Sequence, residues 1–368
     1  VGFFLQLLYF SEMKIVEASI WEKDLRLREP FSISFMTFNS VQNIFVRLVL
    51  ENGICGLGAA APVEEITGES FQGCVDVLDK HLSNEFVGLD IEDQKSFLKK
   101  SKVTFVNNPA ALTAVETAYF DAFCTMLGIP LCTYFGKKHE SFPTSITLGI
   151  EPQDLMIKKA VELKKQGFKV IKAKTGISVE EDIELIKKLR EKLGKVMGLR
   201  VDANQGYDSV SLKTFFSATE GCNVEIIEQP LPAENIQKMS KLPEKIRKSC
   251  MADESLHAPE DANNLVKKPQ PFGSFNIKLM KCRGLSSARE IAGIAERANI
   301  PLMWGCMLES VISISAALHT ALSCQNTKYL DLDGSFDLLD DIAEGGFVLK
   351  EGNLLLTSKP GLGVTLKQ

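Results

Sequence analysis

Between residues 144 and 334, short apolar runs alternate with longer stretches that mix apolar and charged residues. The stretches at 152–167, 178–194 and 286–299 carry apolar residues at helical spacing, whereas the runs are short enough to be buried strands. There are eight such runs: TSITLGI (144–150), FKVIKAKTG (168–176), MGLRVDANQ (197–205), VEIIEQPL (224–231), SCMADESL (249–256), SFNIKLMKC (274–282), PLMWGCMLES (301–310) and KYLDLDG (328–334). Strands and helices that alternate, with seven connections within roughly 190 residues, favour a closed parallel (β/α) barrel over an open sheet.

The segments on either side of this region have a different pattern. The part before it begins with runs typical of antiparallel strands and continues with helical spacing up to 107–136, which predicts an α+β domain. The part after it contains a hairpin pattern, GGFVLKEGNLLLTSKPGLGVTL, that is expected to fold back. We therefore expect four parts: an N-terminal extension (1–12), an α+β domain (13–140), a catalytic barrel (141–334) and a C-terminal segment (335–368).

Composition narrows the classes of partner. A net charge of -5 provides no basic stripe, so nucleic acid is not expected as a partner. No apolar run approaches the ~18 residues of a membrane span, and the apolar start lacks the basic region and cleavage site of a signal peptide, so Met13 is the expected natural start. Nine cysteines without metal-binding spacing indicate reduced thiols in a cytoplasmic protein. We expect a homo-oligomer that acts on a small molecule.

Three acidic residues close consecutive predicted strands, namely Asp202, Glu228 and Asp253. Barrel enzymes keep their chemistry at the C-terminal ends of the strands, so these carboxylates are expected to converge. Together they would raise one another's pKa unless a divalent cation neutralised them, and an all-oxygen set favours Mg²⁺ over zinc. The alternative is that each residue is a helix cap or turn former, as DAN and DES also suggest, but three in register favour the metal site.

Lysines close two other predicted strands. Lys172 and Lys174 are two residues apart on one strand, so both side chains are expected to point into the barrel mouth. Each lysine would lower the pKa of the other, and a nearby metal would lower both pKa values further, towards that of a base useful at pH 7. Lys278 is expected across the mouth from Lys174. Two bases on opposite faces of one carbon can remove a proton and return it on the other side, while the metal takes up the enediolate charge. The alternative for KAK is a solvated strand end.

From about Met13 onward the sequence resembles the muconate-lactonizing subgroup of the enolase superfamily. The motifs that carry the resemblance are KAK, VDANQGYD, EQPL, ADES, NIKLMKCRG, ITGES, ALTAVETAYFDAF, GIPLCTYFG and PGLGV. The resemblance implies a modified (β/α)7β TIM-type barrel and an α+β capping domain built from both chain ends. It implies one Mg²⁺ per subunit on Asp202, Glu228 and Asp253. It also implies that Lys174 takes the proton from the R-substrate and Lys278 from the S-substrate, while Lys172 holds the substrate carboxylate.

The last predicted strand bears on the substrate. Asp331 and Asp333 have period-2 spacing and are expected to face the mouth together. A DxD at this place resembles the dipeptide epimerases, in which the pair binds the substrate α-ammonium; DLDG is also an ordinary turn sequence. By the same resemblance Thr147 and Cys306 line the substrate, although a small cysteine is as often a packing residue.

The expected lid loop lacks a charged residue found in some relatives. Epimerases of Ala-Glu place an arginine in this loop, where the present chain has Met36, next to Phe35 and near Phe38. A buried glutamate side chain would have no partner there, so we expect Met36 to contact a small or hydrophobic second residue. The alternative is that these residues only seal the lid, while Arg26 or Arg28 reaches the substrate.

The sequence therefore predicts an isomerase: a Mg²⁺-dependent dipeptide epimerase of L-Ala-Xaa substrates that works by 1,1-proton transfer. The alternatives within the superfamily are N-acylamino acid racemase, o-succinylbenzoate synthase and cycloisomerase, whose substrates lack a free ammonium. A Schiff-base aldolase would need no metal. A non-catalytic binding protein on the same barrel is the alternative outside catalysis.

Overall fold

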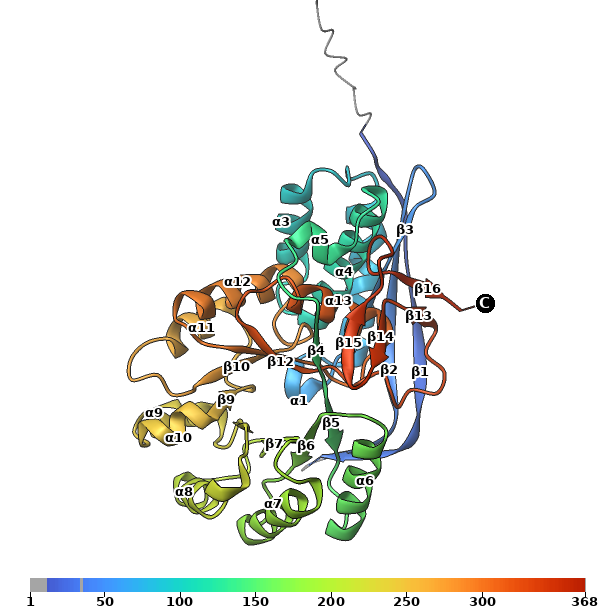
Figure 1. The fold of residues 1–368 in the computed structure, drawn as a ribbon. Helices are drawn as coiled ribbons and strands as arrows, with labels where there is room; N and C mark the ends of the chain where they lie inside the picture. The colour runs from blue at the N-terminus through green and yellow to red at the C-terminus, as the bar shows by residue number, and fades with distance from the viewer. Residues whose placement is uncertain (1–11, 34–35, 368) are drawn as a thin grey trace, which may run out of the picture.

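The computed structural model describes residues 12–33 and 36–367, which form a parallel barrel and a mixed cap beside it (Figure 1). The cap begins with an antiparallel sheet whose strands lie in chain order: β1 (Ile15–Ile33), β2 (Met36–Leu50) and β3 (Cys55–Ala60). Five helices follow it: α1 (Glu64–Thr67), α2 (Phe71–Phe86), α3 (Gln94–Thr104), α4 (Pro109–Met126) and α5 (Leu131–Phe135). The α+β organisation expected for this part of the chain is thus present.

Helix α4 is buried along most of its length and lies directly against β3. Close backbone approach requires glycine on the strand. A Cβ atom at Gly58 would lie 1.9 Å from the carbonyl oxygen of Ala114, and one at Gly56 would lie 2.1 Å from that of Ala118. Because these partners are backbone atoms, they cannot rotate away, and only glycine at these two positions allows the sheet and the helix to pack this closely.

The eight predicted strands are all present and form one parallel sheet, in spatial order from β12 to β5. They are β5 (Ser145–Leu148), β6 (Val170–Lys174), β7 (Gly198–Asp202), β8 (Ile226–Glu228), β9 (Cys250–Ala252), β10 (Ser274–Ile277), β11 (Leu302–Gly305) and β12 (Thr327–Asp331). A bridge between Thr144 and Leu330 joins the two end strands, and Leu332 donates its N–H to Thr144 Oγ1 at 2.9 Å, so the barrel is nearly closed. The prediction of a modified TIM-type barrel is confirmed.

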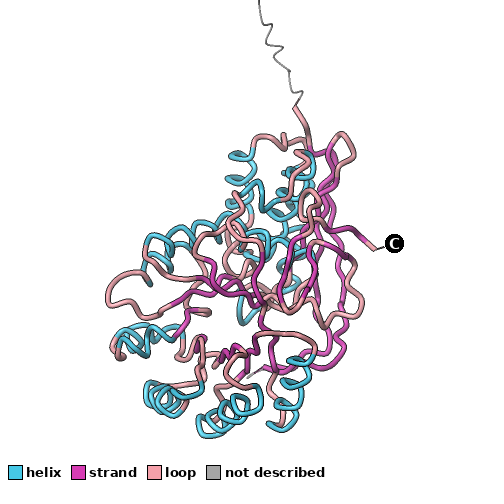
Figure 2. Tube along the Cα trace, viewed as in Figure 1, coloured by secondary structure: helices cyan, strands magenta, loops and turns pink. Residues whose placement is uncertain are grey.

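Seven helical connections join the eight strands, and Figure 2 shows helices around the outside of the barrel. Their helices are α6 (Gln153–Lys165), α7 (Val179–Leu193), α8 (Ser209–Ala218), the pair α9 (Ile236–Ser240) and α10 (Glu244–Ser249), α11 (Pro259–Leu265), α12 (Gly284–Arg297) and α13 (Val311–Ala321). This arrangement leaves the C-terminal ends of the strands open towards the cap. Within the described ranges, no helix has the length and apolar character needed to cross a membrane.

The C-terminal segment forms short strands beside the cap: β13 (Ala343–Gly345), β14 (Phe347–Lys350), β15 (Asn353–Leu356) and β16 (Val364–Leu366). The expected hairpin is β14–β15, which extends to β4 (Ser141–Pro143). Leu362 donates its N–H to Asp121 of α4 at 2.7 Å, so the tail is anchored to the cap. The exact limits of the four expected parts stay a prediction, and the extension 1–12 lies almost wholly outside the described residues.

Candidate active site

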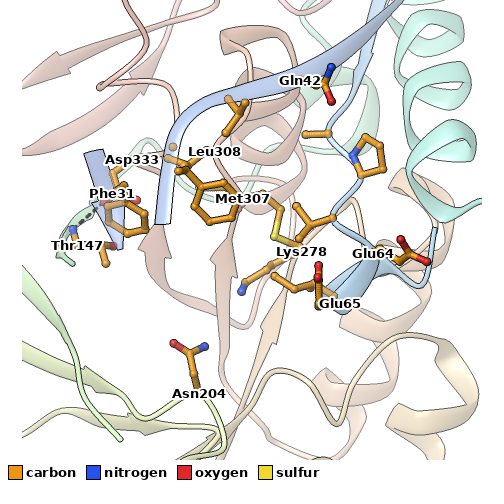
Figure 3. Close-up of a pocket in the computed structure, with 18 of the residues that line it drawn as sticks. Phe31, Gln42, Glu64, Glu65, Thr147, Asn204, Lys278, Met307, Leu308 and Asp333 are labelled. Carbon is orange, nitrogen blue, oxygen red and sulfur yellow. Dashed lines mark hydrogen bonds between the residues drawn. The ribbon is translucent and has the colours of Figure 1, made fainter. Parts of the chain in front are cut away.

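A pocket with a volume of about 400 Å³ lies between the C-terminal ends of the barrel strands and the cap (Figure 3). Eight of the residues that we predicted for the site line this pocket: Thr147, Lys172, Lys174, Asp253, Lys278, Cys306, Asp331 and Asp333. The cap contributes Phe31, Phe38, Val41, Gln42, Glu64 and Glu65. In Figure 3, Phe31, Thr147 and Asp333 lie on one side of the pocket, and Gln42 and Glu64 lie on the other.

The three acidic residues end neighbouring strands and are buried, with exposed fractions of 0% for Asp202 and 1% for both Glu228 and Asp253. Burial and the charge of Asp202 raise the pKa of Glu228 to about 8. Burial also acts to raise the pKa of Asp202, but the ammonium groups of Lys172 and Lys174 outweigh it and hold this pKa below its ordinary value. The three buried carboxylates therefore need nearby cations to remain ionised.

Lys172 lies in the middle of this charge. Its Nζ is 3.0 Å from Asp202 Oδ2, 2.8 Å from Glu228 Oε2 and 2.7 Å from Asp331 Oδ2. The lowered pKa that we expected for Lys172 is wrong for this arrangement. Burial does lower it, but the carboxylates of Asp202, Asp331 and Glu228 together raise the pKa well above its ordinary value. The three carboxylates that contact Lys172 thus set the direction of its pKa shift.

Lys174 and Lys278 stand on strands that are opposite in the barrel, because β6 and β10 have three strands between them on either side of the ring. Lys174 Nζ donates to Asp202 Oδ2 at 2.8 Å and to Asn204 Oδ1 at 2.9 Å. Lys278 Nζ donates to Asp253 Oδ2 at 2.7 Å. Burial lowers the pKa of Lys278, but the charges of Asp253 and Glu228 outweigh it and the net pKa is raised. Two ammonium groups thus reach one pocket from opposite walls.

The acidic set suits a hard divalent cation. Its donors are carboxylate oxygens alone, which Mg²⁺ prefers. Asp253 Oδ1 is buried and accepts no hydrogen bond, although Lys281 Nζ lies 3.1 Å away. As they stand, no three Asp, Glu, His or Cys side chains in residues 12–33 and 36–367 form a cluster that encloses an ion.

Both aspartates of DxD line the pocket, as expected from their spacing, but they have different partners. Asp331 is buried, contacts Lys172 and accepts a hydrogen bond from Ser145 Oγ at 2.5 Å. Asp333 lies beyond the end of β12 and accepts the N–H of Thr147 at 2.7 Å (Figure 3). Burial and the charge of Asp331 raise the pKa of Asp333 to about 7. Asp333 is the member of the pair whose charge no lysine or arginine of the described chain neutralises through an ion pair.

Other predicted contacts have mixed outcomes. The thiol of Cys306 donates to the carbonyl oxygen of Asp331 at 3.3 Å and borders the pocket. The side chain of Met36 lies outside the described residues, and its contact with the substrate stays a prediction. Arg26 does not line the pocket but pairs with Asp340 at 3.0 Å, and Arg28 also lies outside the pocket wall. The alternative in which Arg26 or Arg28 binds substrate is therefore not supported.

Sequence reasoning missed several residues of the pocket. Glu64 and Glu65 on α1 have no ion-pair partner in the described chain, and their side chains are exposed at the rim. Glu254, which follows Asp253, accepts a hydrogen bond from Asn204 at 3.3 Å. The first two stand directly before the ITGES motif, in the first turn of α1, where the helix dipole also favours acidic residues, so the sequence alone did not mark them as pocket residues.

The chain matches two families of known proteins. Residues 15–136 match the family described as "Mandelate racemase / muconate lactonizing enzyme, N-terminal domain". Residues 155–368 match the family described as "Enolase C-terminal domain-like". The two matches cover the cap and the barrel in turn.

Several similar proteins are dipeptide epimerases. The L-Lys-D/L-Arg epimerase of Desulforapulum autotrophicum is 47% identical over 352 residues, which is 96% of this chain and 99% of that protein. The hydrophobic dipeptide epimerase of Enterococcus faecalis is 33% identical, over 96% of this chain and 100% of that protein. The crystal structure of the Methylococcus capsulatus dipeptide epimerase with Mg and L-Arg-D-Lys has a TM-score of 0.94 at 43% identity, covering 96% of this chain and 100% of that one.

These relatives confirm the expected superfamily and the expected class of enzyme, an isomerase. They also bear out the resemblance drawn from the sequence motifs, of which KAK, VDANQGYD, EQPL, ADES and NIKLMKCRG lie at the ends of the strands β6 to β10. The chain belongs to the mandelate racemase / muconate lactonizing enzyme family of the enolase superfamily, within its group of dipeptide epimerases.

Proposed function

We propose that this chain is a Mg²⁺-dependent epimerase that inverts the α-carbon of the C-terminal residue of dipeptides with cationic side chains. One observation carries the proposal: Lys174 and Lys278 reach a single pocket from opposite strands, with buried carboxylates between them. Two bases in this arrangement can act on the two faces of one carbon, which is what inversion by proton transfer requires.

The roles of the chain's own groups follow from their places. Lys172 would hold the substrate carboxylate, Lys174 would accept the α-proton of the R-substrate, and Lys278 that of the S-substrate; in each direction the opposite lysine returns a proton. Mg²⁺, held by the carboxylates of Asp202, Glu228 and Asp253, would stabilise the negative charge that develops on the substrate carboxylate. The cap residues that line the pocket would limit the access of water to the reacting carbon once the substrate is bound.

The free ammonium of the dipeptide substrate would bind beside Asp333 in the pocket. Asp333 keeps a charge that no described lysine or arginine pairs, beside the N–H of Thr147. The ammonium of the first residue would supply the missing cation, and this favours a dipeptide over an N-acyl amino acid. An N-succinyl-L-Arg/Lys racemase from Bacillus cereus is also 30% identical to the chain, so N-succinyl-arginine belongs in the substrate panel.

The preference for L-Ala-Xaa with a small or hydrophobic second residue is not supported. It rested on an apolar lid, and Phe38, Val41 and Leu308 do form an apolar wall. The pocket is also lined, however, by Glu64 and Glu65, which the prediction did not include. Lysine and arginine side chains combine a long apolar stem with a charged head, so such a wall suits them better than it suits a fully apolar side chain.

The test is mass spectrometry of a dipeptide pool incubated with the protein and Mg²⁺ in D₂O. The pool contains Lys-Arg, Arg-Lys, Ala-Leu, Ala-Glu and N-succinyl-arginine. We expect one deuterium at the C-terminal α-carbon of the cationic dipeptides, with less in Ala-Leu and Ala-Glu. Labelling of Ala-Leu alone would restore the hydrophobic preference. Labelling of N-succinyl-arginine alone would replace the dipeptide epimerase with a racemase, and no labelling at all would refute proton transfer.

A further inference from the structure

Lys281 is a lysine whose side chain is completely buried, with an exposed fraction of 0%, and it is not part of the pocket wall. Its Nζ donates to three backbone carbonyl oxygens, those of Asp253 at 2.7 Å, Leu256 at 2.6 Å and Asn276 at 3.0 Å. All three ammonium protons are thus committed to the backbone. A buried ammonium is costly unless it is fully hydrogen-bonded, so this lysine has a defined geometric role in the folded protein.

The contacts of Lys281 connect two strand ends of the site. Asp253 and Leu256 lie in the loop that follows β9, and Asn276 lies on β10. Lys281 and Lys278 belong to one turn after β10, which the hydrogen bond from Cys282 N to the Lys278 carbonyl closes at 2.9 Å. The ammonium therefore fixes the β9 loop against the turn that carries a proposed base.

Asp253 is held from both sides by this turn. Its Oδ1 lies 3.1 Å from Lys281 Nζ, and its Oδ2 accepts the hydrogen bond of Lys278 Nζ at 2.7 Å. The first contact is an ion pair and the second is a hydrogen bond, so rotation of the carboxylate would weaken one or the other. Lys174, across the barrel, depends on Asp202 and Asn204 instead and has no contact with this group.

We propose that Lys281 is a positioning residue that fixes the Asp253 carboxylate and, through it, the ammonium of Lys278 on one face of the substrate carbon. The proposal rests on the two-base mechanism proposed above. It implies that loss of Lys281 impairs proton transfer on the Lys278 face, while the Lys174 face continues to work. A lysine that served stability alone would affect both faces equally.

The experiment compares α-proton exchange with inversion in D₂O for Lys281→Met and the wild type. With the R-substrate, Lys174 can still remove the proton and return a deuteron on the same face, so exchange continues although inversion slows. We expect the ratio of exchange to inversion for the R-substrate to rise on the order of tenfold, because small displacements of a reacting group cost one to two orders of magnitude in rate. With the S-substrate, exchange and inversion are expected to fall together.

Arg190 provides a matched control. It is a mostly buried cation that donates to backbone carbonyl oxygens, at 2.6 Å to Cys222 and 2.8 Å to Met197, on the outside of the barrel. Arg190→Met is expected to lower the melting temperature and leave the ratio unchanged. Lys281→Arg keeps the charge and the hydrogen-bond donors but places them differently. It serves as the test variant if Lys281→Met does not fold, and it is expected to fold and to show a smaller rise in the ratio of exchange to inversion.

The outcomes separate the two proposals. Wild-type protein that neither exchanges nor inverts any substrate in the pool would refute the proposed function itself. An active wild type with an unchanged ratio in the Lys281 variants, even if both rates fall, would overturn the positioning role and leave the epimerase intact. A rise for the S-substrate in place of the R-substrate would contradict the assignment of the two lysines to their faces.

Discussion

Replacement of Asp333 by asparagine is expected to make the protein more stable and less active. The pKa of Asp333 is raised from 3.8 to about 7, so ionisation of this carboxylate opposes folding at neutral pH. Three pKa units correspond to an upper limit of about 4 kcal/mol, and contact with water in the pocket reduces the expected gain to about 1–2 kcal/mol. Asparagine has the same shape and keeps an oxygen for the N–H of Thr147.

The same change removes the charge that would meet the substrate ammonium. Loss of one partner of a charge-assisted hydrogen bond costs about 2–3 kcal/mol, which corresponds to a decrease of roughly 30- to 160-fold in kcat/KM. The decrease is expected for dipeptides and not for substrates whose amine is acylated. Steady-state kinetics on the preferred dipeptide, beside urea unfolding at several pH values, measure both effects.

The pH dependence provides an independent check. The folded-state pKa of Asp333 is above the unfolded value, so its contribution to stability is present below pH 3.8 and is lost as pH rises through about 7. The stability gain of Asp333→Asn is therefore expected to be small near pH 4 and to reach its full size above pH 7. Asp331→Asn is the control. It breaks the buried pair with Lys172 and is expected to reduce stability and activity together.

Two results would refute this reasoning. If Asp333→Asn retained full kcat/KM on dipeptides, the ammonium would have another partner. If the variant were less stable than the wild type at pH 7.5, the ionised Asp333 carboxylate would not oppose folding, and the raised pKa of Asp333 would be refuted.

Three further predictions concern other parts of the chain. The double variant Glu64→Gln, Glu65→Gln is expected to lower kcat/KM for Lys-Arg by roughly tenfold and to leave that for Ala-Leu unchanged, measured side by side. Burial lowers the pKa of His319 to about 4, below the 6.5 of the unfolded chain, so stability falls as pH drops from 6.5 to 4; unfolding of His319→Gln should lack about 3 kcal/mol of this dependence. Gly58→Ala places a Cβ atom 1.9 Å from the Ala114 carbonyl oxygen and is expected to lower the free energy of unfolding by at least about 3 kcal/mol in denaturant titrations, whereas unchanged stability would show that α4 can move away.

The barrel was predictable because each of its elements has a local signal. All eight strands coincide with apolar runs, and the ends of β7, β8 and β9 follow from where the acidic residues interrupt them. The convergence of Lys172, Lys174 and Lys278 on one pocket then follows from topology, since parallel strands bring their C-terminal ends together.

The features of the site that the sequence did not predict depend on distances between strands or on the conformation of segments outside the strands. Period-2 spacing predicts a shared face only within a strand, and β12 ends at Asp331, so the direction of Asp333 was not set by the pleat. The sign of the pKa shift of Lys172 depends on three carboxylates from other strands, at distances no spacing rule supplies. Glu64 and Glu65 belong to a helix of four residues, too short for a periodic signal.

The barrel closes between its two end strands, β5 and β12, and this seam separates substrate-binding residues from those proposed for proton transfer. The lysines and acidic residues proposed for proton transfer stand on the continuous arc from β6 to β10, whereas Thr147 and Asp333 border the seam. Substitutions of Thr147 or Asp333 at the seam can therefore alter which amine or acyl group binds without displacing the proposed catalytic residues on the strands β6 to β10. A lineage that kept the arc and varied the seam could acquire new substrates one contact at a time.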